Sequence, residues 1–288
     1  MSAKPIVVAS DGSEESLRAV DWAAREAVLR GAPLRIVSAS GLLPRMADSH
    51  DHAKYETVSN VIRDESDHAL TSATARAAKV APDLLIDADH LTGGPAEAVT
   101  EAGSGALMLV VGSRGVGAFT AMVLGSVSRY AATHASSPVV VVRDEIGATP
   151  RQVGIGIGGL EGNTAALSFA FEEAALRKAS LVAIHAWQTP RSDISRAGIA
   201  MAEPGHDALE AEATGQLDAL LNEWRDKYPD VPVTYEAVHG HPGRILSGLS
   251  ARADLVVLGR HPAHHGPAAV IHAVLNHAHG SIVTVPSS

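Results

Sequence analysis

The chain of 288 residues has room for two domains of roughly 140 residues, each with a core of its own. Its formal net charge is −9 and both halves are acidic, which argues against nucleic acid as a partner because such a surface repels a phosphate backbone. The absence of cysteine excludes disulfide frameworks, thiolate nucleophiles and zinc sites built on thiolates.

The chain begins with MSAKPIVVAS, in which a single lysine precedes an apolar run too short for a signal peptide. No later stretch stays apolar for the length that a bilayer requires. We therefore expect a cytoplasmic protein without a membrane partner.

The first half alternates short β-branched runs with long amphipathic patterns. Strands are predicted at 6–10, 34–39, 84–90, 107–112 and 139–143, and helices near 14–30, 53–80, 94–103 and 125–135. The runs LMLVV and PVVVVR are apolar without alternation, which is typical of strands covered on both faces in a parallel sheet.

The second half repeats the first. The segment QVGIGIGGLEGNTAALSFAFEEAALRKASLVAIHA resembles PIVVASDGSEESLRAVDWAAREAVLRGAPLRIVSA, and a short polar stretch joins the copies. Strands are predicted at 153–157, 181–185, 233–238, 255–258 and 282–285, with helices between them. The expected fold class is therefore α/β, with two tandem, doubly wound open domains at 1–147 and 150–288. Each is expected to hold a five-stranded parallel sheet in the order 3-2-1-4-5.

The segment VVGSRGVGAFTAMVLGSVSR sets glycines between the fourth strand and the next helix. Ligands of open parallel sheets bind beyond the carboxyl ends of the strands where the strand order reverses, here between the first and fourth strands. The first strand delivers Asp11, and the fourth delivers Gly112 and Gly115. Glycines let the backbone approach a ligand, and Gly125 and Ser126 stand where helical N–H groups favour a phosphate.

This segment is neither of two familiar nucleotide loops. A P-loop would contain GK[ST], but this segment has neither that motif nor any lysine. A dinucleotide-binding fold would have GxGxxG directly after the first strand, and no such motif stands there. Its pattern is G-2x-G-9x-G-S, and here the sequence resembles the universal stress protein family, in which G-2x-G-9x-G-[ST] marks ATP-binding members. The resemblance covers the chain as two tandem copies, and the first copy also carries SDGS at 10–13.

The resemblance implies how the first copy holds a nucleotide. Asp11 would contact the ribose or the nucleotide edge, Val37 or Ser38 would lie near the adenine, and the glycine segment would wrap the ribose and phosphates. The implied ligand is ATP, with Mg²⁺ held mainly by the phosphates. The expected binding residues are Ser10, Asp11, Gly12, Ser13, Val37, Ser38, Gly112, Arg114, Gly115, Gly125, Ser126 and Val127.

Simpler interpretations of the same residues stay open. Asp11 and Ser13 could cap the helix that follows them, as Asp and Ser often do. Gly112 and Gly115 could be ordinary turn glycines. Arg114 points either at a phosphate or at solvent.

The second copy departs from the nucleotide pattern. Gly158 stands where the first copy has Asp11, Gly259 matches Gly112, and Pro262 replaces Gly115, which removes an N–H group. Ala268 and Ala269 take the place of the Gly-Ser pair, and the run GIGIGG reads mostly as strand. We expect this copy to keep the fold and to have lost the nucleotide.

Histidines gather in the second half, among them His261, His264 and His265. They could bind a metal, but no carboxylate or cysteine completes an obvious set, and a solvated loop explains them as well. No metal site made of protein ligands is therefore expected.

The expected function is regulatory. An ATP-binding stress-response protein would change its assembly or its partner docking with the nucleotide, and no residue set for fast catalysis is expected. The alternatives are a nucleotide-dependent enzyme, either an α-phosphate transferase or a slow ATPase, and an interaction module that binds no nucleotide. The apolar last strands of the two copies are expected to cover each other's edges inside one chain, and the resemblance implies a homodimer of such chains.

Overall fold

A computed structural model describes residues 3–40, 52–115, 124–143, 151–159, 162–187, 206–260 and 265–287. The chain divides into two compact units, here called unit 1 and unit 2. Unit 1 is Met1–Glu145 with Ser281–Pro286, and unit 2 is Ile146–Gly280 with Ser287–Ser288. Unit 1 thus contains the first sequence copy together with the last strand of the second.

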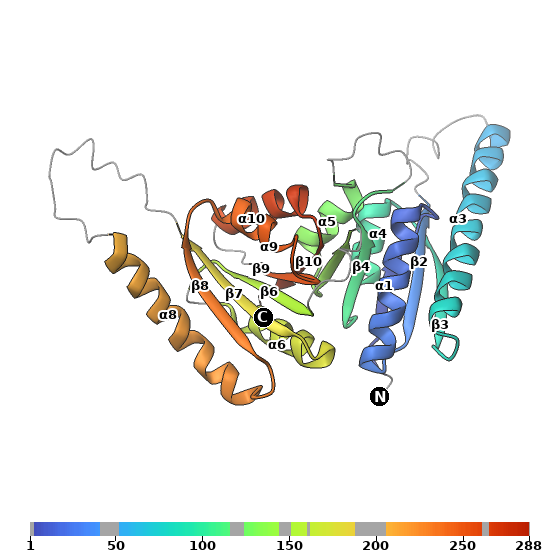
Figure 1. Cartoon of the computed structure of the whole chain (residues 1–288). Helices are drawn as coiled ribbons and strands as arrows, with labels where there is room; N and C mark the ends of the chain where they lie inside the picture. The colour runs from blue at the N-terminus through green and yellow to red at the C-terminus, as the bar shows by residue number, and fades with distance from the viewer. Residues whose placement is uncertain are drawn as a thin grey trace, which may run out of the picture. The chain divides into compact units, whose positions relative to one another are not determined.

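Unit 1 alternates strands and helices along the chain (Figure 1). Its elements are β1 (Ile6–Ala9), α1 (Glu14–Arg30), β2 (Leu34–Ser40), α3 (His52–Val80), β3 (Ile86–Thr92), α4 (Pro95–Ala102), β4 (Met108–Gly112), α5 (Ser126–His134), β5 (Val139–Val142) and β10 (Ser281–Pro286). The strands lie in the order β3-β2-β1-β4-β5-β10. The first five are parallel, so the predicted order 3-2-1-4-5 is confirmed for the first copy.

Local signals fix both ends of α1, which starts at the edge where a ligand is expected. Ser13 is the N-cap, and its side chain accepts a hydrogen bond from the N–H of Ser16. Glu14 and Glu15 occupy the first turn, where negative charge is favourable to the helix dipole. Gly31 ends the helix in the left-handed conformation, with φ at 61°.

The core of unit 1 lies on both faces of the sheet. All residues of β4 and β5 are buried, which confirms that these apolar runs are covered on two sides. The alanines at 69, 73 and 77 form the buried stripe of α3, so this long helix can lie close to the neighbouring layer. Helix α3 packs against α1, β2 and β3, while α4 packs against α5.

The last strand of the chain, β10, completes the sheet of unit 1. It runs antiparallel to β5, with Ile282 opposite Val141 and Thr284 opposite Val139. The fully buried hydroxyl of Thr284 donates a hydrogen bond to the carbonyl of Ala132 over 2.9 Å. The prediction that the last strands of the two copies cover each other is confirmed.

Unit 2 repeats the alternation. Its elements are β6 (Gln152–Ile157), α6 (Thr164–Arg177), β7 (Ser180–Trp187), α8 (His206–Lys227), β8 (Val233–His239), α9 (Pro242–Leu249), β9 (Leu255–Arg260) and α10 (His265–His277). Its parallel strands lie in the order β8-β7-β6-β9, which matches the order of the first four strands of unit 1.

The glycines of β6 have a packing role. A Cβ atom on Gly154 would lie 2.6 Å from the Leu249 side chain, and one on Gly156 would lie 2.7 Å from Leu246. Both leucines belong to α9, so the glycines let this helix approach the sheet closely. The interpretation of GIGIGG as strand is confirmed, because β6 contains both residues.

Candidate functional site

The predicted crevice lies where β1 and β4 run side by side. The two strands are parallel neighbours, with Val8 opposite Val110, and the strand order reverses between them. Their carboxyl ends bring together Asp11 and Gly115, which are far apart in sequence. A Cβ atom placed on Gly115 would overlap Oδ2 of the Asp11 carboxylate. At this edge of the sheet a carboxylate therefore lies beside bare backbone.

Asp11 is exposed and is held by its own loop. Its Oδ1 accepts hydrogen bonds from the N–H of Ser13 over 3.0 Å and from the Ser13 hydroxyl over 2.5 Å. Ser13 is the residue that caps α1. Ser13 is therefore the N-cap, as expected, while Asp11 binds this N-cap residue through Oδ1 and places Oδ2 beside Gly115.

Ser10 and Gly12 shape the loop that carries Asp11. Ser10 is buried, and its hydroxyl lies 3.1 Å from the hydroxyl of Ser16 and accepts the N–H of Gly12 over 3.3 Å. Gly12 has φ at 80°, and a Cβ atom on it would lie 3.4 Å from that of Ala69 in α3. These two residues support the position of Asp11 from inside the fold.

Gly112 makes a packing contact within the fold that the sequence motif does not predict. A Cβ atom on it would lie 2.9 Å from the carbonyl oxygen of Glu15 and 3.1 Å from the nitrogen of Ser16. Its own carbonyl accepts the hydroxyl of Ser128 over 2.6 Å. The missing side chain therefore makes room for the first turn of α1, and this contact within the fold explains the glycine without a ligand.

The start of α5 fits the expected phosphate position. Gly125 is the N-cap, with φ at −60° and ψ at 153°, and its N–H donates to the carbonyl of Ser113 over 2.9 Å. A glycine cannot cap the first N–H groups of the helix with a side chain. Ser126 is exposed and Val127 is half-buried. The helix thus presents an end that attracts anions.

Arg114 forms an ion pair with the first turn of α1. Its Nη2 lies 3.5 Å from Oε1 of Glu15, in the first turn of α1. The same Glu15 oxygen lies 3.6 Å from Nη2 of Arg18. Glu15 therefore stands between two guanidinium groups, one of which comes from the glycine segment.

Val37 and Ser38 are buried parts of the fold. The carbonyl of Val37 accepts the N–H of Ser10 over 2.9 Å, and its side chain has no exposed surface. The hydroxyl of Ser38 accepts a hydrogen bond from Ser66 of α3 over 2.9 Å. These contacts give no separate evidence for an adenine site.

The crevice residues fit a nucleotide in their chemistry. The carboxylate of Asp11 can accept hydrogen bonds from hydroxyl groups, while the start of α5 and the guanidinium of Arg114 attract negative charge. A side chain at 115 would fill the space beside Asp11. Within the described segments, no three His, Asp or Glu side chains gather as a metal site would need.

The corresponding edge of unit 2 has different chemistry. Gly158 follows β6, so the residue aligned with Asp11 supplies no carboxylate there. Helix α10 begins at His265, so Ala268 lies in its first turn and not at the helix start that the alignment of the copies gave it. Pro262, His261 and His264 lie outside the described residues, and so does the side chain of His265.

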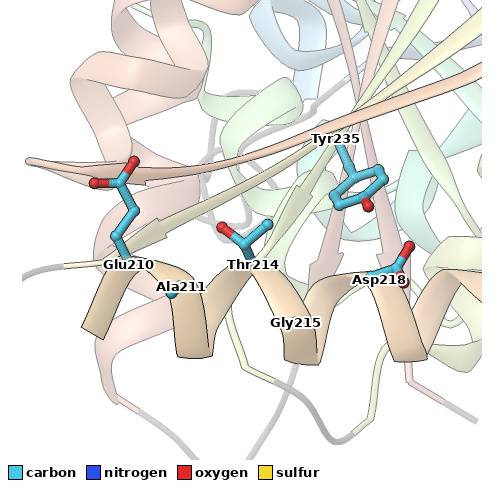
Figure 2. A pocket seen from close by; sticks show the side chains of 6 residues that line it. All are labelled: Glu210, Ala211, Thr214, Gly215, Asp218 and Tyr235. Carbon is cyan, nitrogen blue, oxygen red and sulfur yellow. The ribbon is translucent and has the colours of Figure 1, made fainter. Parts of the chain in front are cut away.

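A pocket of about 590 Å³ lies on unit 2 between α8 and β8 (Figure 2). Glu210, Thr214 and Asp218 line it from the helix, and Tyr235 lines it from the strand. Arg225 donates to Asp218 over 2.9 Å and stacks on the ring of Tyr235 at 4.9 Å. Hydrogen bonds from Arg225 and Tyr235 lower the pKa of Asp218. Asp218 is thus paired with a cation from within the unit.

Comparisons with known proteins agree with the two-copy organisation. The Universal stress protein family matches residues 2–143 and again 150–286. The chain is 32% identical over 266 residues to Universal stress protein Rv2005c of Mycobacterium tuberculosis, which covers 89% of this chain and 86% of that protein. It is 34% identical over 266 residues to a universal stress protein of Mycolicibacterium smegmatis, with the same coverage.

A solved structure supports the fold. The crystal structure of a universal stress protein from Archaeoglobus fulgidus superimposes with a TM-score of 0.70 over 100% of this chain and 97% of that one, at 14% identity. None of the helices in the described segments combines the length and the hydrophobicity needed to cross a membrane.

Proposed function

The chain belongs to the universal stress protein family, and we propose that it is an ATP-binding regulator of the stress response whose unit 1 holds the nucleotide. One observation carries the proposal: the carboxylate of Asp11 lies against the bare backbone of Gly115 at the strand-order reversal. An acceptor for hydroxyl groups and an amide-lined approach for phosphates then share one crevice.

Each part of the nucleotide has a candidate partner. Asp11 would accept hydrogen bonds from the ribose hydroxyls, since its carboxylate is exposed and oriented by Ser13. The first N–H groups of α5, at Ser126 and Val127, would meet the phosphates. Mg²⁺ would bind together with the phosphates, because its ligands are mostly water molecules and substrate oxygens and include few protein groups.

In the proposed role the protein binds ATP as a regulatory ligand and does not turn it over as an enzyme would. The glycine segment contains no lysine, and Arg114 is paired with Glu15, so the usual cation of rapid phosphoryl transfer is missing from the sequence of this loop. Nucleotide binding would change assembly or partner docking instead. Production of ADP or of an adenylated product from ATP at turnover rates typical of enzymes, in the purified protein, would contradict this part of the proposal.

Assembly into a homodimer belongs to the same proposal. The edges of β5 and β10 pair with each other. A second chain would therefore have to bind at another surface to form a dimer. Light scattering with and without ATP measures this directly. A monomer of unchanged mass across the whole ATP titration would argue against regulation through assembly.

The test of nucleotide binding is calorimetry on the full chain with Mg²⁺ and ATP. Asp11→Asn is the sharpest variant, because an asparagine oxygen can still accept the N–H of Ser13 while an amide group takes the place of the second carboxylate oxygen. We expect the wild type to bind ATP and the variant to bind it at least about tenfold more weakly, the size of a lost charge-assisted hydrogen bond. Equal affinity of the two proteins would remove Asp11 from the site, and a wild type that binds no ATP would overturn the proposal.

A further inference from the structure

The ion pair between Arg114 and Glu15 joins the glycine segment to the first turn of α1. Arg114 Nη2 lies 3.5 Å from Glu15 Oε1, and the side chains are 25% and 27% exposed. The pair is therefore partly shielded from water, but a ligand can still reach it. A pair of this kind exchanges partners more readily than a buried one.

The backbone holds Glu15 in this place. The carbonyl of Glu15 sits 2.9 Å from the Cβ position of Gly112, so the first turn of α1 rests on the end of β4. Arg114 follows two residues after that contact. Glu15 therefore lies within reach of Arg114 as a consequence of how α1 packs on β4.

A phosphate and the carboxylate of Glu15 would both bind the guanidinium group of Arg114. Both bind guanidinium through charge-assisted hydrogen bonds, so an arginine that serves one is weakened for the other. Glu15 has a second cation available at 3.6 Å, the guanidinium of Arg18. Release of Arg114 therefore does not leave the carboxylate without a counter-charge.

We propose that Glu15 is a built-in competitor of the nucleotide phosphates for Arg114. This inference rests on the proposed function of unit 1. In the protein without nucleotide, Glu15 holds Arg114. When a polyphosphate binds, Arg114 transfers to it and Glu15 pairs with Arg18 alone. The pair thereby lowers the affinity for ATP and makes the first turn of α1 respond to the phosphates.

The chain offers a matched control at the neighbouring residue. Glu14 also lies in the first turn of α1, but its side chain pairs with Arg76, at 3.6 Å, and not with Arg114. Arg76 keeps its hydrogen bonds to Asp21 when Glu14 is neutral. Glu14→Gln and Glu15→Gln thus remove the same charge from the same helix turn, and only Glu15→Gln frees Arg114.

The experiment measures ATP and adenosine affinity by calorimetry in wild type, Glu15→Gln, Glu14→Gln and Arg114→Gln, with the double variant Glu15→Gln/Arg114→Gln. We expect Glu15→Gln to tighten ATP binding by about two- to fivefold, the range of an exposed ion pair, and to leave adenosine binding unchanged. Glu14→Gln should have a clearly smaller effect. In the Arg114→Gln background the gain from Glu15→Gln should disappear.

Three results would overturn the inference. Equal ATP affinities of Glu15→Gln and Glu14→Gln, in a wild type that binds ATP, would show that Glu15 does not compete, and the proposed function would stand. A gain from Glu15→Gln that persists without Arg114 would show that general electrostatics causes it. A wild type that binds no ATP would overturn the proposed function and this inference together.

Discussion

Asp11 and Gly115 are in contact although more than a hundred positions separate them, and a methyl group on Gly115 would displace the Asp11 carboxylate. We predict that Gly115→Ala weakens ATP binding at least about tenfold while the free energy of unfolding changes by less than about 1 kcal/mol, because the overlapping atom is the end of a side chain that can rotate. Calorimetry and thermal unfolding measure the two quantities.

A double-variant cycle provides the control for this contact. If Gly115→Ala acts by moving the carboxylate, then adding it to Asp11→Asn should cost little more affinity than Asp11→Asn alone. Fully additive losses would mean that Gly115 contacts the ligand independently of Asp11.

Two glycines of the same motif should respond differently to alanine. On Gly112 the new Cβ would meet the backbone of Glu15 at 2.9 Å, whereas on Gly125 the nearest atoms lie at 3.6 Å. We predict that Gly112→Ala lowers the free energy of unfolding by about 1–3 kcal/mol, as overpacking against an immobile backbone does, and that Gly125→Ala costs about 1 kcal/mol or less. Urea unfolding of both variants compares them, and equal losses would contradict the packing role of Gly112.

The sequence predicted the fold well because its signals were local and repeated. The predicted helix at 14–30 coincides with α1 because Ser13, Gly31 and the acidic first turn mark its ends. The other bounds were predicted less closely. The third strand was expected at 84–90 and is found at Ile86–Thr92, and the strands of unit 2 extend further than their apolar runs, since polar residues at strand ends still pair.

The site was predicted only in part, since the roles of its residues depend on tertiary neighbours. The approach of Asp11 to Gly115 followed from topology alone. The role of Gly112 did not, because its missing side chain accommodates Glu15, which no motif links to it. Arg114 was expected at a phosphate or in solvent, and its pairing with Glu15 required the packing of α1 on β4. The spacing of charges along the chain carries no signal for such a contact.

The two copies end an equivalent helix with different residues, which gives a test of backbone strain. Gly31 ends α1 with φ at 61°, and Lys178 ends α6 with φ at 51°. A side chain in this region costs about 1–2 kcal/mol relative to glycine. We predict that Lys178→Gly stabilises the protein by about 1 kcal/mol and that Gly31→Ala destabilises it by a similar amount, both measured by urea unfolding. A loss of stability in Lys178→Gly would mean that the lysine side chain makes contacts that outweigh the strain.

A buried ion pair recurs in both copies. Glu173 is fully buried and pairs with Arg177 one helical turn later, just as Glu26 pairs with Arg30. We predict that Arg177→Met destabilises the protein by about 3–5 kcal/mol, because it leaves a buried carboxylate without its cation. The double variant Glu173→Leu/Arg177→Met should recover most of this loss. Equal stability of wild type and Arg177→Met in urea unfolding near pH 7 would contradict the interpretation.

The nucleotide stoichiometry tests the difference between the two units. We predict one ATP per chain by native mass spectrometry, because Gly158 supplies no carboxylate where Asp11 stands in unit 1. Gly158→Asp restores the carboxylate but not the other features of the unit 1 site. The sequence has Pro262 in place of Gly115, and α10 begins at His265, before Ala268, which aligns with Gly125. This variant should therefore still bind one nucleotide, and Asp11→Asn should bind less than one at the same ATP concentration. Two nucleotides on the wild-type chain would mean that unit 2 builds a pocket by other contacts, and the loss of binding assigned to it would be wrong.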